Sequence, residues 1–162
     1  MKTKDEICCP EFDPTPWDDK MHEWDNRLFI KDTMFIFMHM PFPAVMGKKI
    51  GGLWEKAKAA GAEEQAKDFL LLSHDPSPWK GELYMSVTKE VPGAENVKIS
   101  GTYYTKAFEG PYSAVPQWME ELKQIAVEKD VAFGKIYFYY TTCPKCAKKY
   151  GKNYVVAVCE VK

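Results

Sequence analysis

The sequence predicts an α+β domain in which a strand–helix–strand–strand unit occurs twice. Several stretches are aromatic and β-branched without internal Gly or Pro, which is typical of strands. Two other stretches carry apolar residues at three- and four-residue spacing, which indicates amphipathic helices. These elements recur in the same order at an offset of about 68 residues. Together they predict an antiparallel sheet with two main helices on one face and a ligand groove between the repeats on the other.

The first repeat is expected to cover about residues 28–92. It follows residues 1–27, a Pro-, Asp- and Trp-rich segment that we expect to be irregular and packed on the domain. The predicted elements are strands at Leu28–Ile30 and Met34–Met40 around a turn at residues 31–33, a helix with apolar residues from Val45 to Ala57 that Gly61 closes, a strand at Phe69–Ser73, a loop at residues 74–79 and a strand at Glu82–Thr88. Gly51 and Gly52 interrupt the helix, and close packing against a neighbour is the expected reason.

The second repeat is expected to cover about residues 97–162, so that residues 28–162 form one domain. Its predicted elements are a strand at Val97–Phe108, a turn at residues 109–112, a helix with an apolar stripe from Val115 to Ala126, a strand at Lys135–Tyr140, a loop or short helix at Cys143–Gly151 and a strand at Tyr154–Val161.

Composition limits the classes of partner. The net charge of -1 provides no basic surface for nucleic acid or for an anionic membrane. The start of the chain has no apolar leader core, and no apolar run reaches the length that spans a membrane. We therefore expect a cytoplasmic protein that binds neither nucleic acid nor membrane. Aromatic residues make up 14% of the chain, a density that suits a concave site as well as a core.

Glu82 is the candidate catalytic residue. In its strand Leu83, Met85 and Val87 alternate with the polar positions, so Glu82 and Tyr84 should face away from the helices. On the strand at Lys135–Tyr140, the side chains of Lys135, Tyr137 and Tyr139 share one face. Burial among aromatic rings raises the pKa of a carboxyl group and a nearby Lys lowers it, and either outcome suits acid–base chemistry. The alternative is an exposed sheet face on which these charges are solvated.

The five cysteines are an odd number, which argues against a secreted disulfide framework. Cys143 and Cys146 have the spacing of a zinc knuckle or a redox pair, and Cys8 with Cys9 would complete four zinc ligands. Adjacent cysteines point in different directions, however, so zinc, a disulfide and reduced thiols all stay open. No cofactor and no metal ligand is predicted.

Trp79 and the histidines are the remaining polar or aromatic candidates. Trp79 stands in the predicted loop, where it would cover a ligand or pack on the N-terminal segment. His22, His39 and His74 have no ligand or triad spacing, and we expect structural or surface roles for them.

Two motifs carry a resemblance to a known family. Phe108-Glu-Gly-Pro-Tyr112 precedes an amphipathic helix, and Lys135-Ile-Tyr137 enters the late strand. With the paired loop–strand units Asp75-Pro…Tyr84 and Cys143-Pro…Tyr154, these residues resemble the GyrI-like small-molecule-binding superfamily over about residues 28–162. The chain is also similar to a standalone bacterial and archaeal subgroup with a Cys-Cys-Pro start and no DNA-binding half.

The resemblance implies binding of a hydrophobic, often cationic or electrophilic small molecule between the repeats, and some standalone members hydrolyse strained alkylating compounds. Tyr137 and the turn Gly110-Pro-Tyr112 match the family pattern, whereas Lys135 stands where the family has an acidic residue. This departure weakens the expectation of a cationic ligand and moves the expected general base to Glu82.

Phe108 and Glu109 precede the turn Gly110-Pro-Tyr112. The charge of Glu109 suits the start of the helix, and this structural role is the expected one. Its turn borders the expected groove, however, so Glu109 stays a candidate binding residue.

From these observations we expect a small hydrophobic or aromatic ligand, and hydrolysis of an electrophilic compound if the site is catalytic. The expected ligand-binding residues are Trp79, Tyr84, Phe108, Glu109, Tyr112, Lys135, Tyr137 and Tyr139, around Glu82. The alternative is a non-catalytic sensor, or an interaction or inhibitor module whose cysteines form a structural clip. The oligomeric state does not follow from the sequence.

Overall fold

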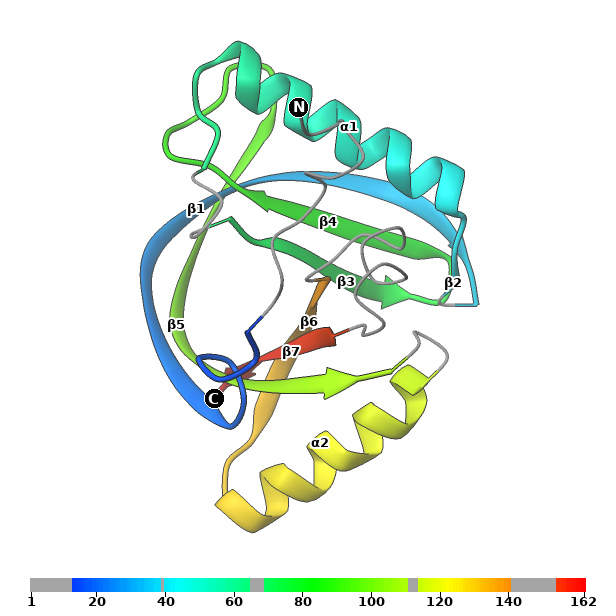
Figure 1. Ribbon diagram of the computed structural model, residues 1–162, viewed down its shortest axis with the longest axis vertical. Coiled ribbons are helices and arrows are strands. Elements are labelled where there is room, and N and C mark those ends of the chain that lie inside the picture. The colour runs from blue at the N-terminus through cyan, green and yellow to red at the C-terminus, as the bar shows by residue number, and fades with distance from the viewer. Residues whose placement is uncertain (1–12, 39, 65–68, 111–113, 141–153) are drawn as a thin grey trace, which may run out of the picture. The chain divides into compact units, whose positions relative to one another are not determined.

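The chain has an α+β fold, as predicted. The structure is a computed structural model and describes residues 13–38, 40–64, 69–110, 114–140 and 154–162. In chain order, its elements are β1 (Lys20–Phe37), β2 (Met40–Pro41), α1 (Pro43–Ala59), β3 (Leu71–Ser77), β4 (Lys80–Ser86), β5 (Glu95–Glu109), α2 (Val115–Lys129), β6 (Phe133–Tyr140) and β7 (Tyr154–Val161). The order strand–helix–strand–strand therefore occurs twice (Figure 1).

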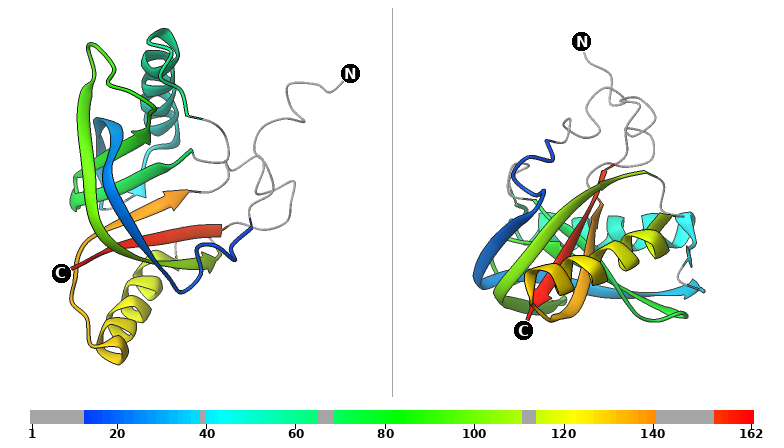
Figure 2. Two further views of the ribbon diagram at one scale, coloured as in Figure 1. Left: turned by 90° about the vertical axis from the view of Figure 1, so that its left-hand side faces the viewer. Right: turned by 90° about the horizontal axis from the view of Figure 1, so that it is seen from below.

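The residues divide into two compact units, which we describe separately. One unit is Glu23–Gly101, and the other joins the chain up to His22 with Thr102–Lys162. The long strands β1 and β5 pair with each other and contribute to both units (Figure 2). The repeat boundaries expected from the sequence, near residues 92 and 97, stay a prediction.

In the Glu23–Gly101 unit the strand order is β2-β1-β4-β3, and these pairings are antiparallel. Helix α1 packs on one face of these strands (Figure 1). The core between them contains Ile30, Met34, Ile36, Leu53, Ala57, Leu71, Leu83, Met85 and Val87. Leu83 and Met85 are the alternate β4 positions that the sequence assigns to the helix side, so Glu82 and Tyr84 lie on the opposite face.

Strand β1 differs from its prediction in two ways. Residues 31–33 continue the ladder with β4 and do not form a turn, because Lys31, Asp32 and Thr33 pair with Tyr84, Leu83 and Glu82. Asp32 lies on the helix side, where Lys49 of α1 approaches its carboxylate to 3.5 Å. The strand also begins at Lys20, inside the segment expected to be irregular. Pairing with other strands overrides the weak strand propensity of these polar residues.

Strand β3 is longer at its end than predicted. It reaches Ser77, although residues 74–79 are expected from the sequence to be a loop. The register with β4 shifts between His74 and Ser77, so the strand accommodates Pro76 in an irregularity and still pairs Ser77 with Lys80. Pro78 and Trp79 alone connect the two strands. This hairpin places Trp79 at a tight turn.

In the Thr102–Lys162 unit the strand order is β6-β7-β5, again antiparallel, and α2 packs on one face of these strands (Figure 2). The core contains Tyr104, Phe108, Trp118, Leu122, Val155, Ala157 and Cys159. Strand β7 has the predicted bounds. The described residues before β1 are held to this unit by Asp18, which pairs with Lys106 at 2.8 Å, and by Asp19, which pairs with Lys129 at 3.1 Å.

Candidate functional site

Glu82 lies in the middle of β4, and its side chain is only 8% exposed. The Lys31 ammonium is 2.6 Å from its Oε2 atom, and the Tyr84 hydroxyl donates a hydrogen bond to its Oε1 atom at 3.0 Å. The same ammonium lies 5.7 Å from the centroid of the Tyr84 ring. Each carboxylate oxygen thus has a donor, as a buried charge requires.

Strand register explains why these three residues meet. Lys31 of β1 is directly opposite Tyr84, and Thr33 is directly opposite Glu82. Diagonal neighbours on one sheet face are within reach of long side chains, so Lys31 reaches Glu82 one row away. On the other side of β4, the residue opposite Glu82 is His74 of β3. Thr33, Glu82 and His74 therefore form one row across three strands.

The ion pair fixes the charge of Lys31. Its hydrogen bond to Glu82 raises the pKa of the ammonium above the ordinary value of 10.5. Partial burial opposes this shift, and the negative charges of Glu82 and Glu95 add to it. Lys31 is therefore a cation at neutral pH, beside the carboxylate that the sequence indicates as catalytic.

Lys31 is a site residue that the sequence reasoning misses. The polar character of residues 31–33 favours a turn when the stretch is considered by itself. The available signal is a period of two: Lys31, Thr33, Phe35 and Phe37 alternate with Ile30, Asp32, Met34 and Ile36, and three of the latter four enter the core. His74 is likewise expected to be structural, and only the register of β3 places it opposite Glu82.

In the Thr102–Lys162 unit, the predicted residues of β6 have aromatic partners. The Lys135 ammonium lies 5.2 Å from the centroid of the Tyr137 ring, and Tyr137 is buried. The Tyr139 ring meets Trp17 edge-on at 5.6 Å. Tyr137 is opposite Val158 of β7, which is itself opposite Thr105 of β5. These positions share the face of the strands that does not pack on α2.

His22 connects the residues before β1 to this aromatic cluster. Its ring stacks on Trp17 at 5.0 Å, and its Nε2 atom is 3.0 Å from the hydroxyl of Thr105, which is buried. Thr105 also donates a hydrogen bond to the Lys20 carbonyl at 3.4 Å. His22 therefore contributes to holding the first residues of β1 on β5.

Three other predicted ligand-binding residues lie elsewhere. Phe108 is on the α2 side of β5 and stacks on Trp118 at 5.1 Å, so it is a core residue and does not line the polar face. Glu109 is exposed at the end of β5. Trp79 is half exposed at the turn between β3 and β4. Tyr112 lies outside the described residues. The groove expected between the repeats stays a prediction.

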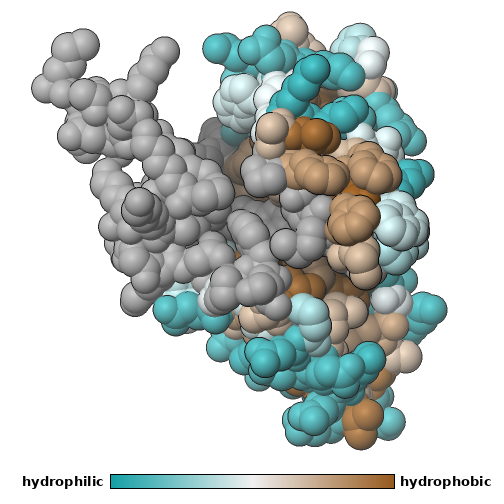
Figure 3. Space-filling view, turned by 90° about the vertical axis from the view of Figure 1, so that its right-hand side faces the viewer, coloured by the Kyte–Doolittle hydropathy of each residue, from teal (hydrophilic) through white to brown (hydrophobic). Residues whose placement is uncertain are grey.

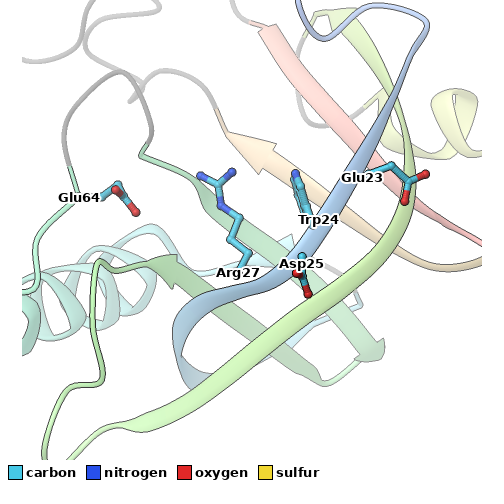
Figure 4. Close-up of a pocket in the computed structure, with 5 residues that line it drawn as sticks. All are labelled: Glu23, Trp24, Asp25, Arg27 and Glu64. Atoms are coloured by element: carbon cyan, nitrogen blue, oxygen red, sulfur yellow. The ribbon is translucent and has the colours of Figure 1, made fainter.

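A shallow hollow of about 360 Å³ lies along β1 in the Glu23–Gly101 unit. It is lined by Glu23, Trp24, Asp25, Arg27 and Glu64. Trp24 and Arg27 project to the same side of the strand, and the guanidinium lies 5.4 Å from the centroid of the indole ring (Figure 4). The hollow is open and mostly charged, and it contains none of the predicted site residues.

The predicted cysteine site is not part of the described structure. Cys8, Cys9, Cys143 and Cys146 lie outside the described residues, and so does His39. Cys159 is a buried free thiol in β7. Within the described part of the chain, no group of three or more His, Cys, Asp or Glu side chains is arranged to hold a metal ion. No helix of that part is long and apolar enough to cross a membrane.

A family described as "Bacterial hydrolase" matches residues 1–161. The chain belongs to this bacterial hydrolase family. No curated protein matches the chain. The crystal structure of the EcmrR C-terminal domain matches with a TM-score of 0.69 at 13% identity, over 90% of this chain and 98% of that one. An uncharacterized conserved protein from Listeria innocua matches with a TM-score of 0.65 at 11% identity, over 90% of this chain and 92% of that one.

At these identities the likeness to solved structures shows the fold alone. The chain therefore has the same fold as these two structures. In this member of the bacterial hydrolase family, Glu82 is a carboxylate with two held oxygens. The arrangement therefore places a buried carboxylate next to a fixed cation on one sheet face.

Proposed function

We propose that the protein binds a small hydrophobic or aromatic molecule at the face of the Glu23–Gly101 unit that carries Glu82. We propose further that it hydrolyses an electrophilic ligand there. The main observation behind this proposal is the buried Glu82 carboxylate, which contacts Lys31 through one oxygen and Tyr84 through the other. The bacterial hydrolase family supports the proposed hydrolysis, and the fold supports the proposed binding of a small molecule.

In the proposed reaction, Glu82 accepts a proton from a water molecule while the water oxygen forms a bond to the electrophilic carbon. The bond from that carbon to the leaving group breaks, and the bonding electrons stay with the leaving group. The proton held by Glu82 then passes to the leaving group, so the products are an alcohol or acid and the protonated leaving group. The fixed charge of Lys31 stabilises the negative charge that develops near it.

Native mass spectrometry of the purified protein against a panel of hydrophobic electrophiles tests the proposal, with adducts and hydrolysed products scored separately. Glu82→Gln should abolish turnover and retain ligand binding, because the amide cannot take the proton but has nearly the same shape. Glu128→Gln is the matched control, because Glu128 is exposed on α2 and is not a predicted site residue. Unchanged turnover in Glu82→Gln would remove Glu82 from the mechanism.

A second function is favoured by the same observation. A carboxylate with donors on both oxygens also suits recognition without chemistry, as in a passive sensor. Binding without any product from the wild-type protein, across the panel, would favour the sensor over the hydrolase. No binding at all would overturn both.

A further inference from the structure

Four large apolar side chains at one end of the Glu23–Gly101 unit are exposed by half or more. They are Phe35 (60%), Phe37 (52%), Met38 (62%) and Trp79 (50%), and we call them the aromatic rim. Apolar side chains gather on this face of the molecule (Figure 3). Exposed large apolar side chains contribute little to the stability of the fold, and a cluster of them indicates a binding surface.

The rim is structurally organised. The Phe37 ring meets the Trp79 ring edge-on at 5.4 Å. The backbone NH of Ile36 donates to the Trp79 carbonyl at 3.0 Å, which ties the turn between β3 and β4 to the end of β1. The Phe35 ring stacks on Phe42, the residue before α1, at 6.1 Å. The rings are therefore held in place while half of their surface stays in water.

Met38 gives an independent indication that the rim has a function. Among the described residues, four that are not Gly have a positive φ: Asp19, Asn26, Met38 and Asp130. Asp and Asn tolerate this conformation, whereas a long apolar side chain is uncommon in it. Gly or Asn would fit the φ of 47° at Met38 with less strain. Because the Met38 side chain is largely exposed, packing does not explain its presence.

The rim continues along the sheet face that carries Glu82. Phe35 is opposite Lys80, and the next residues on the same face are Thr33 and Glu82, which are opposite each other. Two residues along a strand correspond to about 7 Å. The backbone of Phe35 is thus about 7 Å along β1 from the row that contains Glu82, and Phe37 lies one further step of about 7 Å away.

We infer that the aromatic rim binds a flat aromatic group of the ligand while a reactive group on the same molecule reaches Glu82. The ligand class is an electrophile with a planar aromatic end, separated from its reactive carbon by a short spacer. Flat rings suit this surface because aromatic side chains pack edge-on or offset against other rings. A Met side chain adapts to such a ring and adds sulfur–aromatic contact. The inference rests on the proposed function for the role of Glu82.

The test compares two esters: ethyl naphthylbutanoate, which has an aromatic end and a spacer, and ethyl octanoate, which has no ring. Dissociation constants are measured by native mass spectrometry in a Glu82→Gln background, so that binding is separated from turnover. Phe37→Ala and Met38→Gly should each weaken binding of the naphthyl ester about five- to tenfold and leave the octanoate unchanged, since one aromatic contact contributes about that much. Val127→Ala, which removes an exposed apolar side chain from α2, should change neither.

Met38→Gly separates a binding role from a structural one. Gly accommodates the positive φ, so the melting temperature should be retained or raised while binding of the naphthyl ester is weakened. Equal binding of the naphthyl ester by wild type and both rim variants would overturn the inference, even where Glu82 proves catalytic. Loss of a dimer on substitution would also overturn it, because the rim would then join two copies of the chain. If the rim variants weaken binding but the wild type shows no turnover, the rim is a binding surface and the proposed hydrolysis is wrong.

Discussion

The Lys31 ammonium lies 2.6 Å from the Glu82 carboxylate across the ladder between β1 and β4. Both groups are on the sheet face away from α1, and the ammonium is the more exposed of the two, at 20% against 8% for the carboxylate. A buried carboxylate needs its partner more than a partly solvated ammonium does. Substitution of only one member of the pair is therefore expected to destabilise the folded protein.

Lys31→Met should be more destabilising than a typical surface substitution. It removes the Lys31 cation from the buried Glu82 carboxylate, and breaking such a pair costs about 3 kcal/mol, at the low end of the usual range because Lys31 is partly exposed. The double variant Lys31→Met/Glu82→Gln should recover part of that loss, because the buried charge is removed. Urea unfolding at pH 7 measures the two single variants, Lys31→Met and Glu82→Gln, and the double variant. Additive effects in this double-mutant cycle would show that the contact is energetically weak.

The pH dependence of this pair has a definite sign. Because the pKa of Lys31 is raised in the folded protein, its contribution to stability is complete below the ordinary value of 10.5. The contribution is lost as the pH rises toward the higher pKa of the folded state. The contribution of Lys31 is therefore complete across neutral pH.

The sequence predicts the fold more completely than the site, for a physical reason. Periodicity reports which face of an element is apolar, so the sequence alone assigns Leu83 and Met85 to the helix side and Glu82 to the opposite side, as observed. Register between strands is not encoded locally. The partner of Glu82 depends on which β1 residue is opposite it, and no feature of β4 alone indicates Lys31.

Phe108 is a case in which a motif and the alternation of the strand indicate different roles. Its place at the start of Phe-Glu-Gly-Pro-Tyr predicts a contact with the ligand. Side chains alternate along β5, however, and this alternation places Phe108 on the α2 side, where it packs against Trp118. The glycine pair of α1 is a case of a different kind, because Gly51 and Gly52 are expected to allow close packing of the helix. A Cβ atom added at either position would meet nothing within 4 Å, so close packing does not explain these glycines.

Phe108→Ala and Glu109→Ala form a matched pair on adjacent residues of β5. Loss of the buried ring should cost about 3–5 kcal/mol, because the transfer free energy and the cavity both contribute. Loss of the exposed Glu109 side chain should change stability by less than about 0.5 kcal/mol. Chemical denaturation of both variants measures the difference. Equal effects would mean that Phe108 does not occupy the core.

Cys159 is expected to be an unreactive thiol that makes the stability of the folded protein depend on pH in the alkaline range. Burial raises its pKa from 9.0 to about 12. Between these values the unfolded thiol ionises and the folded thiol does not, so this residue lowers the stability of the folded state as the pH rises from 9 toward 12. At pH 8.5 iodoacetamide should modify Cys159 only after unfolding, as peptide mass mapping of that residue would show.

The same residue can be checked thermodynamically. Cys159→Ala should be less stable than wild type at pH 8, because it leaves a small cavity. The difference between the two proteins should shrink as the pH rises above 9, since the variant has no thiol to keep neutral. A constant difference up to pH 11 would show that the thiol titrates alike in both states. Alkaline groups that do not interact with Cys159 cancel in the comparison, whereas Tyr104, which is directly opposite Cys159, contributes to the difference because the thiolate charge raises the pKa of its hydroxyl.

Two glycines should respond to the same substitution with opposite signs. Gly52 lies in α1, where an added Cβ meets open space, so Gly52→Ala should stabilise the protein by about 1 kcal/mol through helix propensity alone. Gly81 begins the buried part of β4, and an added Cβ would lie 3.1 Å from Met34 Cε and 3.2 Å from Ile36 Cγ2. Met34 can adjust, but the β-branched Ile36 is buried and has few alternative rotamers.

Gly81→Ala should therefore cost about 1–2 kcal/mol, because overpacking outweighs the gain from a less flexible unfolded chain. Thermal unfolding of the two variants and the wild type measures both changes: the melting temperature should rise for Gly52→Ala and fall for Gly81→Ala. Gly47→Ala is the control within α1, because its added Cβ also meets open space. Stabilisation by Gly81→Ala would show that the sheet under Met34 and Ile36 is more loosely packed than the contact distances imply.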